Sequence, residues 1–416
     1  MSTKLGWSRV FEVADKGLGT LNRLGFETIN LAEEKLLEAA CKATGLYDFG
    51  DKRFREGFSV LIKAYRKEAE LSPLGKIVTR ADTLRLLSNR LQLVENRKRI
   101  PAIAKETFED PIVIIGLPRC GTTFLHRLLG QDPANRVPLT WETMIPSPES
   151  LQPKRTNETA PRIQKVAQRL KWFGRLAPEY RKIHRTGTNY PQECISILSH
   201  SFQSVRFHRT HFVPSYWRWL HQSDNRFAYR EHRAFLQHLQ YFQAGNQSKR
   251  WILKTPAHTF FVEALLEVYP AARFIQTHRE PITALASNAS QIKMLRKVFS
   301  HSPKKSEAGR IVKDWSKALD RLTNIRQKIG EERFLDLHYS EVASEPMAIV
   351  RKIYDYFGFE LKPEQEARMK QFCLLQPKGK YGVHSYTPTE LGFNWKEHGP
   401  AFDSYRERFN IPSKSS

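Results

Sequence analysis

Short apolar runs alternate with longer amphipathic stretches along most of this chain. Four consecutive β-branched residues, Ile112 to Ile115, predict a strand that is buried on both faces, as in a parallel sheet. Similar runs predict further strands at 251–256, 273–277 and 334–339. Amphipathic segments between and after them predict helices at 260–269, 282–294 and 347–357. The alternation predicts a doubly wound α/β fold, in which a P-loop-like parallel sheet is flanked by helices.

The region before the first strand has a different pattern. Strong helix formers and apolar residues at helical spacing predict helices at 31–40, 54–71 and 81–99. We therefore expect a helical N-terminal subdomain over 1–105 and an α/β domain over 106–416. Within the second domain, Pro138 to Glu142 is expected to form another strand, and residues about 145–245 a helical insertion rich in His and aromatic residues.

A glycine loop follows the first predicted strand. Gly116 and Gly121 have the G-x4-G spacing of phosphate-binding loops, and a strand–loop–helix layout aims backbone N–H groups at an anion. Thr122 stands where nucleoside triphosphatases carry Lys, and the basic residue, Arg119, lies inside the loop. The loop predicts a site for a phosphate-like group without the usual lysine on a triphosphate.

Two more polar motifs follow predicted strands. Lys254 ends the strand that begins at residue 251, and His278 and Arg279 follow the strand at 273–277. Because ligands bind at the carboxyl ends of strands in such sheets, we expect Arg119, Lys254 and Arg279 to converge. The basic segment 376–394 could cover an anionic cofactor, or it could be a solvated tail.

Composition limits the expected cellular location and the classes of binding partner. The 416 residues are 40% hydrophobic, and no run of about 18 apolar residues predicts a membrane span. No signal peptide is evident, and the four Cys form neither a disulfide framework nor a zinc pattern, so we expect a cytoplasmic location. The net charge of +24 favours anionic small molecules, polyanions or peripheral association with an anionic membrane. Nucleic acid is not expected, because no nucleic-acid-binding signature stands out.

These segments together resemble the sulfotransferases that use 3′-phosphoadenosine 5′-phosphosulfate (PAPS), over most of the chain. Residues 112–129 resemble the family's 5′-phosphosulfate loop. Residues 273–290 resemble its 3′-phosphate element, in which an Arg precedes a Ser by eight residues, as Arg279 precedes Ser287. A bacterial-type branch, distantly related to tyrosylprotein sulfotransferases, is more similar still. Its segments TGLxDFG, FREG, YPxEC, LKxPxH, THRxP and GxHxY are matched at 44–50, 54–57, 190–194, 253–258, 277–281 and 382–386.

The resemblance implies PAPS as co-substrate and no metal. It implies that Lys254 contacts the bridging oxygen and the sulfonate. Residues about 145–245 are expected to bind the acceptor, because apolar acceptors favour aromatic walls. Arg119 and the backbone from Cys120 to Thr123 would hold the phosphosulfate, and Arg279 with Ser287 the 3′-phosphate. The expected cofactor-binding residues are Arg119, Cys120, Gly121, Thr122, Thr123, Arg279, Ser287, Tyr339, Lys378, Lys380, Tyr381, Gly382 and His384.

The catalytic base is left open between two residues. Glu142 is favoured, because a Glu at the matching place is the base in the tyrosylprotein relatives; the alternative is a structural carboxylate paired with one of the many Arg. His258, four residues after Lys254, is the rival, because imidazole titrates near neutrality.

The predicted function is in-line transfer of a sulfuryl group to a hydroxyl or amine of a small-molecule, lipid or carbohydrate acceptor. A nucleotide kinase or hydrolase of the P-loop type is one alternative, which Thr122 and the lack of an evident Asp pair for Mg²⁺ argue against. A non-enzymatic basic anion-binding protein is the other.

Overall fold

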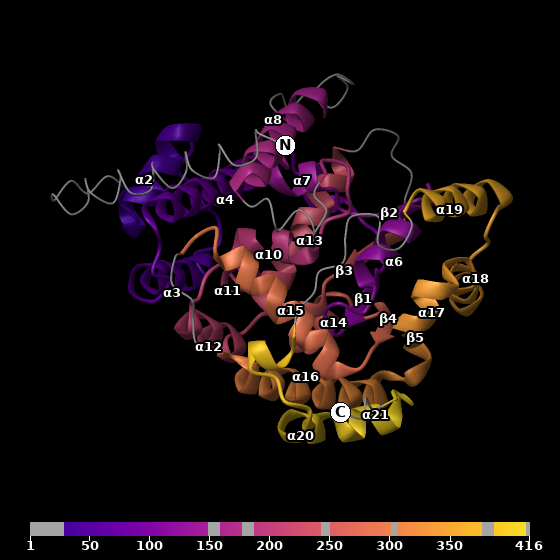
Figure 1. Ribbon diagram of the computed structural model, residues 1–416. Helices are drawn as coiled ribbons and strands as arrows, with labels where there is room; N and C mark the ends of the chain where they lie inside the picture. The colour runs from indigo at the N-terminus through magenta and orange to yellow at the C-terminus, as the bar shows by residue number, and fades with distance from the viewer. Residues whose placement is uncertain are drawn as a thin grey trace, which may run out of the picture.

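The sheet at the centre of the molecule is parallel throughout. The computed structural model describes residues 29–148, 159–176, 187–242, 250–300, 306–376 and 387–412. Within these ranges the sheet has five strands in the order β2-β3-β1-β4-β5 (Figure 1). The strands are β1 (Ile112–Gly116), β2 (Asn135–Arg136), β3 (Arg250–Lys254), β4 (Arg273–His278) and β5 (Phe334–His338). β1 therefore lies between β3 and β4, with Ile112 opposite both Ile252 and Arg273.

Alternate residues of β1 pack against helices on opposite faces of the sheet. Val113 and Ile115 share a core with α10 (Cys194–Leu198), α13 (Arg226–Tyr241), α14 (Val262–Val268) and α16 (Ala308–Ile329). Ile112 and Ile114 share another with α6 (Thr122–Leu129), α17 (Tyr339–Ser344) and α18 (Pro346–Phe357). Burial on both faces explains the unbroken apolar run, and the doubly wound α/β prediction is confirmed.

The N-terminal helices do not have a core to themselves. Phe58 and Leu61 pack in one cluster with Phe202, Tyr216 and Leu220. The helices are α2 (Glu33–Thr44), α3 (Phe54–Lys67), α4 (Pro73–Arg99) and α5 (Ala102–Lys105), and their partners include α11 (Arg206–Thr210) and α12 (Pro214–Gln222). In Figure 1, α2 to α4 lie on the opposite side of the sheet from α18 and α19 (Pro363–Leu375). The domain division at residue 105 stays a prediction.

The strand predicted at Pro138 to Glu142 is wrong. The strand of this region, β2, is earlier, and α7 (Thr140–Met144) begins where the predicted strand should continue. Glu142 lies in the first turn of α7, and its Oε2 accepts a hydrogen bond from the Leu139 N–H at 2.8 Å. Such a side-chain cap satisfies a backbone group that a helix start leaves without a partner, so it favours the helix.

The remaining elements surround this core. The longer helices are α8 (Thr159–Leu176) and α15 (Pro281–Arg296), and α20 (Trp395–His398) and α21 (Asp403–Arg408) lie near the C-terminus. Short 3₁₀ turns span Ser199–Ser201, Pro256–Phe260, Glu331–Arg333, Thr389–Leu391 and Gly399–Phe402. Within the described ranges, every helix is too short or too polar to cross a bilayer.

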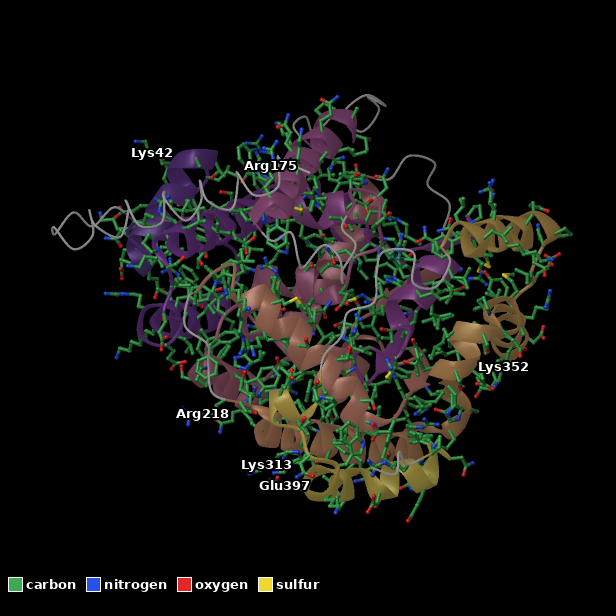
Figure 2. All side chains as sticks on the ribbon, viewed as in Figure 1. Lys42, Arg175, Arg218, Lys313, Lys352 and Glu397 are labelled. Carbon is green, nitrogen blue, oxygen red and sulfur yellow. The ribbon has the colours of Figure 1, made fainter. Side chains whose placement is uncertain are left out.

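The large positive charge is distributed over many elements. Figure 2 shows labelled basic side chains at separate edges of the molecule, namely Lys42 on α2, Arg175 on α8, Arg218 on α12, Lys313 on α16 and Lys352 on α18. Other basic residues are buried and paired, as Arg326 is with Asp336 at 2.7 Å. The net charge of +24 therefore does not come from one basic tail or one helix.

Several imidazoles are buried in the two layers of helices. Burial disfavours the charged form and lowers the pKa of these groups to about 3: His126, His200, His211, His232 and His238. The same effect lowers the pKa of His208 and His221 to about 4. The folded protein thus keeps these side chains neutral at pH values where an unfolded chain protonates them.

We expect stability to fall as the pH drops below about 6.5, the pKa of a histidine in an unfolded chain. Between that pH and the depressed folded pKa, the unfolded chain binds more protons, and each imidazole contributes up to about 1.4 kcal/mol per pH unit. Thermal unfolding midpoints measured from pH 9 to pH 5 should be level above pH 7.5 and should fall clearly between 6.5 and 5. A constant midpoint down to pH 5 would contradict this expectation.

Candidate active site

The loop between β1 and α6 has a conformation that depends on glycine. Gly116 has φ 116°, and a Cβ there would lie 2.5 Å from the carbonyl oxygen of Thr277. Gly121, with φ 81°, is the N-cap of α6. Between them Arg119 has φ 67°, a left-handed conformation that costs a non-glycine residue of order 1–3 kcal/mol and is concentrated at functional sites. The loop bends sharply, and the N-terminus of α6 faces the carboxyl edge of the sheet.

A cavity of about 270 Å³ lies at this N-terminus. Three arginines from different parts of the chain reach it, Arg119 from the loop, Arg209 from α11 and Arg279 from the end of β4. The lining residues are Pro118, Arg119, Gly121, Thr122, Thr123, Phe124, Glu193, Arg209, Pro256, Arg279, Asn288, Gln291 and Tyr339. Guanidinium groups and a helix N-terminus both favour an anion, so we call this space the cationic cavity.

Hydrogen bonds fix the arginines of the cavity relative to one another. Arg279 donates from Nη1 to the carbonyl oxygen of Arg119 at 2.8 Å, and its guanidinium carbon lies 4.3 Å from the centroid of the Tyr339 ring. Arg119 donates from Nε to Ser287 Oγ at 3.3 Å. The structure thus brings together Arg119, Arg279, Ser287 and Tyr339, four of the predicted cofactor-binding residues.

Lys254 ends β3 and is almost completely enclosed. Its side chain is 2% exposed, and Nζ donates to Thr123 Oγ1 at 3.1 Å and to Glu193 Oε1 at 2.5 Å. Burial lowers the pKa of Lys254, while the Glu193 carboxylate acts in the opposite direction. An ammonium group in such surroundings interacts strongly with any new negative charge, because little water screens it.

A second, smaller cavity adjoins the cationic cavity. It measures about 60 Å³, and the two share Glu193, Arg209, Pro256 and Asn288. Most of its remaining wall is aliphatic or aromatic, formed by Ile195, Val205, Trp217, Ala257, Phe260, Ile292, Ile311 and Trp315. We call it the apolar cavity. Its polar lining includes His208, Arg310 and Asp314.

The sequence of residues 111–363, more than half of the chain, matches the family model of the sulfotransferase family. The chain belongs to this family. The crystal structure of sulfotransferase STF1 from Mycobacterium tuberculosis H37Rv has a TM-score of 0.77 and 31% identity, and the match covers 90% of this chain and 98% of that one. Sulfotransferase STF9 from Mycobacterium avium has a TM-score of 0.80 and 27% identity over 94% and 100% of the two chains.

A curated relative is also similar. The omega-hydroxy-beta-dihydromenaquinone-9 sulfotransferase Stf3 of Mycobacterium tuberculosis (strain CDC 1551 / Oshkosh) is 25% identical over 300 residues. The match covers 68% of this chain and 70% of the relative. The predicted bacterial-type sulfotransferase is therefore confirmed at the level of the family and of sulfuryl transfer.

Some predicted site residues of this sulfotransferase lie away from the cationic cavity. The Cys120 side chain is buried and does not line the cationic cavity, and burial raises the pKa of its thiol to about 12. His258 is also buried, with Nδ1 2.7 Å from the Tyr229 hydroxyl, and burial lowers its pKa well below the ordinary value. The other predictions, Lys378, Lys380, Tyr381, Gly382 and His384, lie outside the described residues.

Glu142 does not line either cavity. One oxygen of its carboxylate pairs with the Arg136 guanidinium, and the other caps α7. Residues around the start of α7 hold the segment that precedes Glu193, because the Thr140 N–H donates to Tyr190 O and the Gln192 N–H donates to Pro138 O. The structure gives Glu142 the structural role that the sequence left as an alternative. Its assignment as the base stays an untested prediction.

Four polar residues that line the cationic cavity were missed. Asn288 and Gln291 lie on α15, one and four residues after Ser287, so helical spacing could have found them. Glu193 belongs to the YPxEC segment, which was noted without a role. Arg209 carries no sequence signal, since it reaches the cavity only through the packing of α11 against α15.

We expect Arg136→Met to lower the free energy of unfolding by about 3–5 kcal/mol, because it leaves the buried Glu142 carboxylate without its cationic partner. Urea unfolding followed by circular dichroism would measure the loss. The control is Arg218→Met at an exposed position of α12, which should change stability by no more than about 0.5 kcal/mol. Similar stabilities for the two variants would show that the Arg136–Glu142 pair does not support the fold.

Proposed function

We propose that this sulfotransferase transfers the sulfuryl group of PAPS to the hydroxyl group of an apolar small molecule or lipid. The observation that carries the proposal is the position of Lys254. The buried ammonium lies between Thr123, which lines the cationic cavity, and Glu193, which lines both cavities. An anionic donor and an apolar acceptor would therefore meet beside a buried positive charge.

The cationic cavity has two groups of residues that suit the two anionic ends of PAPS. PAPS carries a phosphosulfate at one end and a phosphate at the other. The N-terminus of α6, with Arg119 and the hydroxyls of Thr122 and Thr123, suits the phosphosulfate. Arg279, beside the Arg119–Ser287 hydrogen bond, suits the 3′-phosphate, because a guanidinium can hold two phosphate oxygens at once.

The burial of the Lys254 ammonium supports a role in stabilising the leaving group. In sulfuryl transfer, the bond from sulfur to the phosphate oxygen breaks while a bond from sulfur to the acceptor oxygen forms. The electron pair of the broken bond stays on the phosphate, which gains negative charge as it leaves. A preorganised ammonium in a site with little water stabilises this charge far better than water does, and Lys254 is such a group.

The apolar cavity supports an apolar acceptor. Aromatic and aliphatic side chains such as Trp217, Phe260 and Trp315 favour an apolar ligand with a few oriented polar contacts. The relative Stf3 is named for action on a hydroxylated menaquinone derivative, a lipid with a hydroxyl group. We extend this chemical class, an apolar alcohol, to the present enzyme.

Adenosine 3′,5′-bisphosphate, the donor without its sulfuryl group, should bind and raise the unfolding temperature, and ATP with Mg²⁺ should do so less. Arg279→Ala should weaken binding of the bisphosphate by about 10- to 100-fold, because charge-assisted hydrogen bonds are lost. A thermal-shift assay would measure the unfolding temperatures. Isothermal titration calorimetry would measure the affinities, with Arg218→Ala as the exposed control. A preference for ATP–Mg²⁺, or equal affinity of the two variants, would contradict the proposal.

Lys254→Met should lower kcat by about 10²- to 10³-fold while KM for PAPS changes little, because the ammonium acts mainly on charge that develops during transfer. The assay is a mass-spectrometric screen for sulfonated products over alcohols, phenols, amines, sugars and isoprenoid alcohols. Lys313→Met, an exposed change on α16, is the control. Undiminished turnover by Lys254→Met would remove the lysine from the mechanism.

A further inference from the structure

Glu193 is the carboxylate that the donor and acceptor spaces have in common. It is the N-cap residue of α10 and lines both the cationic and the apolar cavity. Its side chain is 17% exposed, in contrast to the 2% of its partner Lys254. A ligand in the apolar cavity can therefore contact the Glu193 carboxylate, while the lysine lies deeper.

Both oxygens of Glu193 are oriented by neighbouring groups. Oε1 accepts a hydrogen bond from Lys254 Nζ at 2.5 Å, and Oε2 accepts one from Thr255 Oγ1 at 3.3 Å. The two donors are consecutive residues at the end of β3, so the carboxylate has a fixed position relative to the sheet. On the backbone side, the Glu193 N–H donates to the side-chain oxygen of Gln192 at 2.9 Å.

The two bases expected from the sequence lack this placement. Glu142 caps α7 and pairs with Arg136, and it lines neither cavity. His258 is 1% exposed and bonded to Tyr229, and protonating it would place a charge in surroundings that strongly disfavour one. A general base must lie within hydrogen-bond reach of the proton that it accepts, and among these three residues only Glu193 faces the space where an acceptor would lie.

We propose that Glu193 is the catalytic base of the transfer, an assignment that rests on the proposed function. As the acceptor oxygen bonds to sulfur, its proton passes to the Glu193 carboxylate. The S–O bond to the leaving phosphate breaks, and the phosphate keeps the electron pair beside Lys254. Adenosine 3′,5′-bisphosphate and the sulfate ester leave, and Glu193 returns its proton to water.

The pairing with Lys254 suits this role. While the pair is intact, the ammonium holds the carboxylate in its ionised form, which is the form that accepts a proton. When Lys254 engages the developing charge on the phosphate, its attraction for Glu193 is divided. The lysine then holds the carboxylate less tightly at the stage of the reaction when a proton must be taken up.

The test compares acceptors that differ in their need for a base. Glu193→Gln keeps the size of the side chain and an oxygen acceptor for Lys254, but it cannot take up the proton. With 4-methylphenol, kcat/KM should fall by about 10²- to 10⁴-fold, and with 4-nitrophenol, which is already ionised at pH 8, by less than about tenfold. Affinity for adenosine 3′,5′-bisphosphate should be nearly unchanged. Glu397→Gln, at a side chain 71% exposed (Figure 2), is the matched control.

A pH profile with the best alcohol from the product screen gives an independent measurement. In the parent enzyme, kcat/KM should fall at acidic pH as a carboxylate is protonated, and Glu193→Gln should lose this limb of the profile. Equal losses for both phenols, with the acidic limb retained, would make Glu193 a positioning residue for Lys254 and overturn the assignment. An acceptor-dependent loss in Glu142→Gln instead would overturn it in favour of Glu142. Failure of the unmodified enzyme to bind adenosine 3′,5′-bisphosphate would overturn the proposed function itself, and the base assignment with it.

Discussion

The burial of the Lys254 ammonium is the constraint on which the arrangement of the site depends. Removing an ion from water costs several kcal/mol unless a counter-charge and hydrogen bonds replace the water. Here the counter-charge is Glu193 and the added hydrogen bond goes to Thr123. Three segments distant in sequence must therefore meet at one point, namely the end of β3, the first turn of α6 and the start of α10. The glycine loop at Gly116 and Gly121 positions the first turn of α6, and the packing of the insertion positions the start of α10.

That constraint also explains the carboxylate at Glu142. Glu193 can neutralise Lys254 only if its segment is held firmly, and the backbone around Leu139 forms an antiparallel bridge to Pro191. Glu142 caps the helix that begins there and is paired with Arg136, which in turn lies over the Trp251 ring at the start of β3. One buried ion pair thus supports the segment that carries the other.

The sequence predicted the parts of the site that depend on the sheet. Arg119, Lys254 and Arg279 each follow an apolar run, and parallel strands place their carboxyl ends at one edge, so local pattern and topology together were enough. The prediction of a strand at Pro138 to Glu142 was wrong because Pro138 to Trp141 has a strand-like composition, while the capping carboxylate of Glu142 favours a helix. Glu193 and Arg209 were missed because their helices are positioned by tertiary packing, which no spacing in the chain records.

The sharing of one carboxylate between two cavities has a consequence for the order of events. Before a donor is present, the Glu193 carboxylate is a counter-charge of the Lys254 ammonium. In the proposed mechanism, a donor in the cationic cavity offers the ammonium a second anionic partner, and the ammonium then holds the Glu193 carboxylate, the proposed base, less tightly. Proton removal is then coupled to the presence of the group that the acceptor oxygen attacks. This coupling needs no moving domain, because it follows from the electrostatics between Lys254 and Glu193.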